Sequence, residues 1–92
     1  MIGHCVERVI FEVEGVEFEA YCKGCAEINN YSEVIGEIKI TEISEMYSIG
    51  GEKENLEIDY FELYKSDTDF HSKVEEAIKD KLAKTGNWEL KL

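Results

Sequence analysis

The amino-acid sequence predicts an α+β fold in which an antiparallel β-sheet of about four strands packs against one C-terminal α-helix. Apolar and polar residues alternate over residues 5–22, with an interruption at Glu14-Gly15, as expected for a hairpin. Alternation resumes at residues 34–49, and apolar residues then recur at helical spacing from Phe70 to Leu82. Strands followed by a helix are typical of α+β domains, and 92 residues are expected to form a single domain, residues 1–92.

The tight turn at Glu14-Gly15 sets the register of the predicted hairpin. If Val13 lies opposite Val16, one face of the hairpin is apolar and buried. The other face then holds Arg8, Ile10, Glu12, Glu17, Glu19 and Tyr21. In this register Glu12 lies directly opposite Glu17, and like charges that face each other destabilise a sheet. The pair is a local cost that calls for a reason.

The segments after the hairpin predict a loop at residues 26–33 and a third strand at residues 34–49. Ile38 and Ile40 are expected to point inward, and a slip in the alternation near Glu42-Ile43 predicts a bulge or bend. Residues 56–64 fit both a strand and a helical face, and we favour a fourth strand for the first half.

The C-terminal helix has clear start and stop signals. Ser66, Asp67 and Thr68 are residue types that cap helix N-termini, and Gly86 is expected to end the helix after about Thr85. The tail at residues 87–92 alternates again and could form a short closing strand.

The charge of the chain is strongly acidic and unevenly placed. Ten basic residues against 21 acidic residues give a formal net charge of −11, and residues 1–64 hold 15 of the acids but only 4 of the bases. Such a surface argues against direct binding to nucleic acid or to anionic membranes, because both are negatively charged. It favours a basic protein partner, or a highly charged surface with no specific role.

The thiols suggest a metal site or a set of unrelated cysteines. The predicted register brings His4, Cys5, Cys22 and Cys25 to the open end of the hairpin, and three sulfurs with one imidazole would complete a tetrahedral zinc site. Adjacent His4 and Cys5 would point to opposite faces of a strand, which disfavours this site. In the alternative, Cys5 and Cys22 are core residues and Cys25 is a loop thiol, and no cofactor is needed.

Other features point to a protein without an enzymatic role. An odd number of cysteines argues against a disulfide framework, and neither a signal peptide nor a membrane-spanning segment is expected, which favours the reducing cytoplasm. The sequence has no nucleophile elbow, phosphate-binding loop or zinc-protease motif. His71 is expected to be a solvated surface residue, so no catalytic residues are predicted.

The acidic face of the sheet is the candidate binding surface. Acidic residues on an outer sheet face are usually just solvated and protect strand edges. However, carboxylates on neighbouring strands and at alternate positions repeat at about 4.7–7 Å, which is comparable to the phosphate spacing of a nucleic acid. The predicted contacts are Glu12, Glu14, Glu17, Glu19, Tyr21, Glu42, Glu45, Glu57 and Asp59, with Glu52 and Glu54 as further candidates.

The pattern from Gly36 to Leu82, which is GEIKITEISEM, then an acidic linker, then SDTDFHSKVEEAIKDKL, resembles small early proteins of bacteriophages. The resemblance implies an inhibitor of a host defence enzyme, of the anti-CRISPR or anti-restriction kind, that resembles DNA in its charge. Its partner would be a basic, nucleic-acid-binding protein in the host cytoplasm. Two other hypotheses remain: a small zinc-stabilised adaptor, and a structural phage protein that forms a homodimer through a sheet edge.

Overall fold

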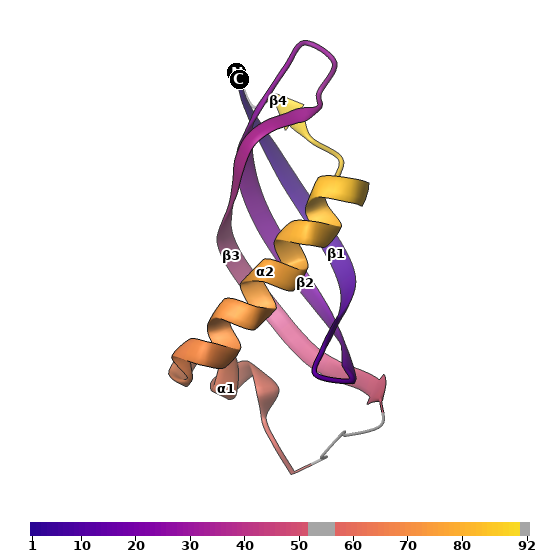
Figure 1. The fold of residues 1–92 in the computed structure, drawn as a ribbon, viewed down its shortest axis with the longest axis vertical. Helices are drawn as coiled ribbons and strands as arrows, with labels where there is room; N and C mark the ends of the chain where they lie inside the picture. The colour runs from indigo at the N-terminus through magenta and orange to yellow at the C-terminus, as the bar shows by residue number, and fades with distance from the viewer. Residues whose placement is uncertain (52–56, 91–92) are drawn as a thin grey trace.

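A computed structural model describes residues 1–51 and 57–90, which form one antiparallel sheet with helices on one of its faces (Figure 1). The strands are β1 (Ile2–Val13), β2 (Val16–Ile28), β3 (Val34–Gly51) and β4 (Glu89–Leu90), in the spatial order β3-β2-β1-β4. The helices are α1 (Tyr60–Ser66) and α2 (Thr68–Thr85). The predicted α+β class and sheet of four antiparallel strands are confirmed, and α1 is an additional helix.

The β1–β2 hairpin has the predicted register along its whole length. Val13 pairs with Val16 and Ile2 pairs with Glu27, without a bulge between them. Glu14 (φ 52°) and Gly15 (φ 83°) both have positive φ, as a two-residue type I′ turn requires. The turn sequence therefore decides which side chains of both strands face the helices.

The core lies between the sheet and the helices. Phe11 and Phe18 stack across the hairpin with ring centroids 5.6 Å apart. The ring of Phe18 meets Tyr60 of α1 edge-on at 4.9 Å and Phe70 of α2 at 5.9 Å. Further along α2, the predicted residues Val74, Ile78 and Leu82 are fully buried against the sheet. One continuous apolar cluster thus joins the hairpin to both helices.

Strand β3 pairs with β2 through a ladder that is interrupted by bulges, as the slip near Glu42-Ile43 predicted. The register shifts between Tyr21 and Cys22 and again between Lys23 and Gly24 of β2. At these places Ser44 and Thr41 of β3 donate hydroxyl hydrogen bonds to the carbonyl oxygens of Tyr21 (3.3 Å) and Lys23 (3.2 Å). Side chains therefore hold β3 to β2 where the regular ladder is broken.

The loop predicted at residues 26–33 is shorter than expected, because β2 continues through Ile28. Ala26 and Ile28 are buried in the core, which extends the strand. The turn that follows is closed by Asn29, whose side-chain oxygen accepts hydrogen bonds from the backbone N–H of Tyr31 (2.8 Å) and Glu33 (3.1 Å).

The fourth strand predicted within residues 56–64 is wrong for the described residues, and Leu56 lies outside them. Residues 57–59 form no strand, and α1 begins at Tyr60. Asp59 caps this helix, since its carboxylate accepts hydrogen bonds from the backbone N–H of Phe61 (3.1 Å) and Glu62 (3.2 Å). The fourth strand is instead β4, in the tail, which pairs with Gly3 and His4 of β1.

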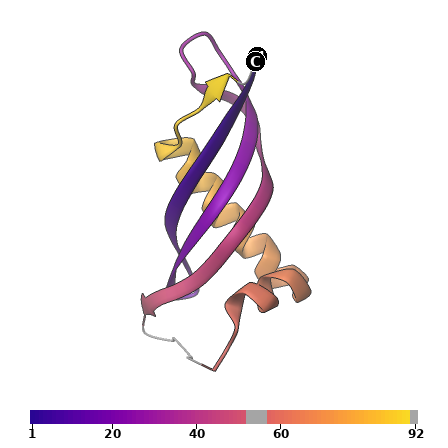
Figure 2. The ribbon, with the colours of Figure 1, turned by 180° about the vertical axis from the view of Figure 1, so that it is seen from behind.

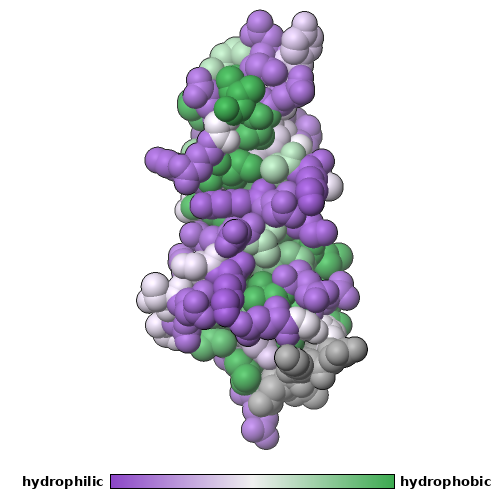
Figure 3. All heavy atoms as spheres, viewed as in Figure 1, coloured by the Kyte–Doolittle hydropathy of each residue, from purple (hydrophilic) through white to green (hydrophobic). Residues whose placement is uncertain are grey.

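Helix α2 begins and ends at the predicted residues. The carboxylate of Asp67 accepts a hydrogen bond from the backbone N–H of Phe70 (3.0 Å), and Gly86 follows the last helical residue. Hydrophilic side chains cover most of the surface on this side of the molecule, with smaller hydrophobic areas between them (Figure 3). No helix in the described part of the chain is long and apolar enough to cross a membrane.

Gly86 is required by the close approach of Leu82 and Trp88 and not by its backbone conformation, since its φ of −66° suits any residue. A Cβ atom there would lie 2.5 Å from the carbonyl oxygen of Leu82 and 2.9 Å from Nε1 of Trp88. These two atoms also bond to each other, because Trp88 Nε1 donates to the Leu82 oxygen at 3.1 Å. The tail and the end of α2 therefore pack together only around a glycine.

We expect Gly86→Ala to lower the free energy of unfolding by about 1–3 kcal/mol, because the added methyl group overpacks this contact. Gly36→Ala is the matched control, since its Cβ would meet Glu27 at an ordinary 3.4 Å. Urea unfolding of both variants measures the difference. Equal stability of the two variants would contradict the packing described for Gly86.

Candidate functional site

The face of the sheet that points away from the helices is uncovered, and we call it the open face. Figure 2 shows β1, β2 and β3 in front and α2 behind them. Apolar side chains are exposed there: Val6 by 52%, Ile10 by 51% and Tyr47 by 43%. The strand pairing places Ile10, Glu19 and Tyr47 side by side across β1, β2 and β3. The open face therefore combines apolar and charged groups.

Arg8 forms the centre of a charged cluster on the open face. Its guanidinium group lies 3.2 Å from a carboxylate oxygen of Glu19 and 3.1 Å from one of Glu45, and it sits over the ring of Tyr21 at 5.6 Å. It also donates a hydrogen bond to the Tyr47 hydroxyl at 3.4 Å. The hydrogen bond with Glu19 is the main cause that raises the pKa of Arg8, and likewise that of Tyr47. Two of the predicted contact carboxylates are therefore partly neutralised.

A second cation lies next to this cluster. Lys23 of β2 lies 3.2 Å from a carboxylate oxygen of Glu42 of β3. Both side chains are about half exposed, so the pair is screened by water and adds little stability. Glu42 is thus a third predicted contact residue that has a cationic partner.

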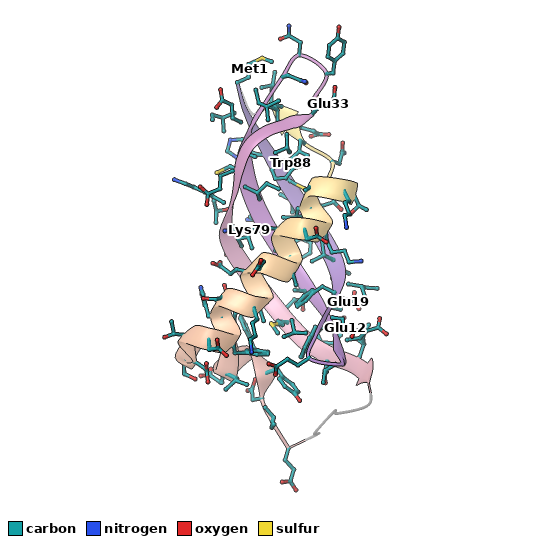
Figure 4. The ribbon with its side chains drawn as sticks, viewed as in Figure 1. Met1, Glu12, Glu19, Glu33, Lys79 and Trp88 are labelled. Atoms are coloured by element: carbon teal, nitrogen blue, oxygen red, sulfur yellow. The ribbon has the colours of Figure 1, made fainter. Side chains whose placement is uncertain are left out.

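Glu12 and Glu17 form a like-charge pair on the open face. They are paired directly across the hairpin next to its turn, as predicted, and both are exposed. Neither has a cationic partner within ion-pair distance among the residues that the structure describes. Figure 4 shows Glu12 close to the hairpin turn, with Glu19 further from the turn on the neighbouring strand. A like-charge pair in this position costs about 0.2–1 kcal/mol.

The other predicted contact residues that the structure describes, Glu14, Glu57 and Asp59, lie outside the three strands of the open face. Glu14 lies in the turn and forms an ion pair with Lys73 of α2, which raises the pKa of that lysine. Asp59 caps α1, and Glu57 is exposed two residues before it. Glu52 and Glu54 lie outside the described residues. The predicted acidic surface is thus narrower than expected.

The four predicted metal ligands are divided between the two faces of the sheet. Cys5 and Cys22 are buried beneath the helices, whereas His4 and Cys25 face each other on the open face. No group of three or more His, Cys, Asp and Glu side chains in residues 1–51 and 57–90 is placed to hold a metal ion. The side chains of His4 and Cys25, although paired across the hairpin, are not joined by a hydrogen bond.

The two buried thiols have raised pKa values. Burial is the main cause for both, and it raises the pKa of Cys5 and that of Cys22 to about 11. The charge of Glu7 contributes further in both cases. Glu7 points to the helix-covered side, where its carboxylate accepts a hydrogen bond from the backbone N–H of Asn87 at 3.0 Å. These residues hold the tail against β1.

His71 was expected to be solvated, but its ring packs on Tyr64, with centroids 4.4 Å apart and nearly parallel planes. Its Nδ1 lies 3.1 Å from the carbonyl oxygen of Tyr64, and its Nε2 lies 3.3 Å from Glu75. Burial, followed by the charge of Glu75, raises the pKa of Tyr64 to about 12. The cluster fixes α1 against α2. The spacing of four residues between His71 and Glu75 was the only sequence signal for it.

No protein-family model, curated protein or solved structure matches this chain. The function is therefore inferred from the chemistry of the open face and of the strand edges beside it.

We expect a single thiol, that of Cys25, to react rapidly with a disulfide reagent at pH 8. Cys5 and Cys22 are buried and remain protonated at this pH, because their pKa values of about 11 lie above the ordinary 9.0. A spectroscopic thiol assay should find one fast equivalent, and two more after unfolding. Cys25→Ser should remove the fast equivalent, and three fast equivalents in the folded protein would contradict this placement.

The same thiols set the direction of the stability change at alkaline pH. The pKa of each thiol is higher in the folded state than in the unfolded state. The contribution of the thiols to the free energy of unfolding is therefore complete below pH 9 and is lost as the pH rises towards 11. Cys22→Ala should flatten this alkaline decline in thermal unfolding scans between pH 8 and pH 11. An unchanged slope would show that Cys22 ionises equally easily in both states.

Proposed function

We propose that this protein is a non-enzymatic binding protein that docks its open face onto a basic surface of another protein. The observation that carries the proposal is the Glu12–Glu17 pair, which is exposed, repulsive and without a cation among the described residues. A lysine or arginine of a partner placed between the two carboxylates would turn this repulsion into attraction.

The apolar side chains beside this pair support a protein partner. Ile10 and Tyr47 are exposed in the row next to Glu12 and Glu17, and Val6 follows along β1. Protein interfaces combine apolar and aromatic groups with a charged rim, whereas a surface that imitated the phosphates of a nucleic acid would need charged groups alone. The Arg8 cluster also breaks the acidic array, so the open face fits a mixed surface better than a copy of nucleic acid.

The net charge of −11 supports rapid association with a basic partner, because opposite potentials steer two proteins together. A nucleic-acid-binding protein of the host cytoplasm is the partner class proposed here. The resemblance of residues 36–46 and 66–82 to early bacteriophage proteins makes a host defence enzyme the first candidate to test.

The proposal is tested by affinity capture from a bacterial lysate at low and high salt, followed by mass spectrometry. Glu12→Lys/Glu17→Lys should abolish capture of the salt-sensitive partner, because the reversed pair repels a basic surface. In a purified pair of proteins the loss should be at least about tenfold, which corresponds to about 1.4 kcal/mol.

The control variant is Glu33→Lys/Glu37→Lys, which makes the same change in net charge away from the hairpin turn. Both residues are exposed, so folding should be preserved. Circular dichroism checks that both variants are folded. If the two variants lose capture equally, net charge and not the Glu12–Glu17 pair governs binding, and the proposal fails.

A further inference from the structure

The outer edge of β1 is open in the part of the strand that leads to the hairpin turn. β1 pairs with β2 from Ile2 to Val13, but its other side pairs with β4 only at Gly3 and His4. Figure 2 shows this strand at the margin of the sheet, and α2 behind it. In an antiparallel strand alternate residues direct their N–H and C=O groups outward. The tail lies against β1 at Cys5 and Glu7, but between Arg8 and Val13 these groups have no strand partner in the described part of the chain.

The two long edges of the sheet differ in how they are protected. β3 carries bulges at the positions of Thr41 and Ser44, and such bulges hinder the addition of another strand. β1 is regular from end to end and contains no proline. The inward-pointing carboxylate of Glu7 accepts the backbone N–H of Asn87, so the tail covers β1 at that residue and the open edge begins after it. The β1 edge is therefore the one that can accept a strand.

A groove of about 430 Å³ lies between the turn end of β1 and the flank of α2. It is lined by apolar Val13 and Ala77 and by carboxylates from both elements. Lys73 pairs with Glu14 and Lys84 pairs with Asp80, whereas Glu12 and Glu76 have no cationic partner within ion-pair distance among the described residues. Side chains of a strand added to β1 would alternate between the open face and this groove.

We propose that the β1 edge from Arg8 to Val13 binds an extended basic segment of the partner as an additional strand. This inference rests on the proposed function, because it assigns the segment to the same basic partner. Lysine or arginine side chains could lay their apolar stems on Val13 and Ala77 and direct their charges to Glu12 and Glu76. A second copy of this chain fits less well, because its own β1 would bring Glu12 and Glu14 into a groove that is already acidic.

The test uses a synthetic nine-residue peptide of alternating lysine and valine, which is long enough for the open part of β1. Two further peptides carry N-methyl groups on either the odd or the even amides. An added strand directs only one of these sets of amides towards β1. Calorimetry at about 50 mM salt should show that one N-methylated peptide loses at least tenfold in affinity while the other binds like the parent peptide.

Two measurements on the protein locate the binding. Amide hydrogen exchange should slow at alternate residues of Arg8–Val13 when the parent peptide binds. Glu76→Lys should weaken binding of the peptide several-fold, because it reverses a charge of the groove. Glu33→Lys makes the same change in net charge far from the groove and should leave the affinity nearly unchanged.

Equal binding of the two N-methylated peptides, or no exchange protection along β1, would overturn the edge proposal. A dimer in light scattering that Ile10→Cys cross-links through its new thiol would also overturn it, in favour of a second copy. These failures differ from that of the proposed function. Capture of the partner that is lost in Glu12→Lys/Glu17→Lys but insensitive to an excess of the parent peptide would retain docking through the open face and exclude the edge.

Discussion

The register of the β1–β2 hairpin is the constraint on which the rest of the structure depends. The type I′ turn at Glu14-Gly15 pairs Val13 with Val16, and every later pair follows from it. The turn places Phe11 and Phe18 where Tyr60 and Phe70 can pack against them. A shift by one residue would move these rings to solvent and the glutamates into the core. Hydrophobic burial thus fixes the same register that opposes Glu12 and Glu17.

Because the helices cover only one face of the sheet, the two faces differ in their charged groups. The helix side buries the apolar cluster and carries mixed charges, as in the ion pairs of Lys73 and Lys84. The open face has no such cover, and its cations are placed to neutralise Glu19, Glu42 and Glu45. Next to the hairpin turn, Glu12 and Glu17 form an acidic area without a cation among the described residues, beside exposed Ile10 and Tyr47. The open edge of β1 borders the same area, so face and edge could bind one partner together.

The sequence predicted the elements whose signals are local and agree with one another. The hairpin had both its turn and its alternation, and α2 had Asp67, an apolar face and Gly86. Helix α1 was missed because alternation before Tyr60 competed with the capping residue Asp59, and the cap with helical packing of Tyr60 and Tyr64 prevailed.

The candidate site was predicted only in part, because much of it depends on contacts between distant segments. The pairing of Glu12 with Glu17 follows from one turn. The ion pair of Arg8 with Glu45 depends on the bulged pairing of β2 with β3, which the sequence does not specify. The separation of the predicted metal ligands follows from strand geometry, since the adjacent residues His4 and Cys5 must point to opposite faces of the sheet.

The central claim is that the Glu12–Glu17 pair costs stability in the free protein and is retained for a partner. The most direct measurement is the free energy of unfolding of Glu12→Gln, Glu17→Gln and the double variant at low ionic strength. The account predicts that each single change stabilises the protein by about 0.2–1 kcal/mol, and that the double variant gains little more, because one substitution already removes the repulsion. Unchanged or lower stability of both single variants would contradict the account, since a pair without a cost needs no partner to explain it.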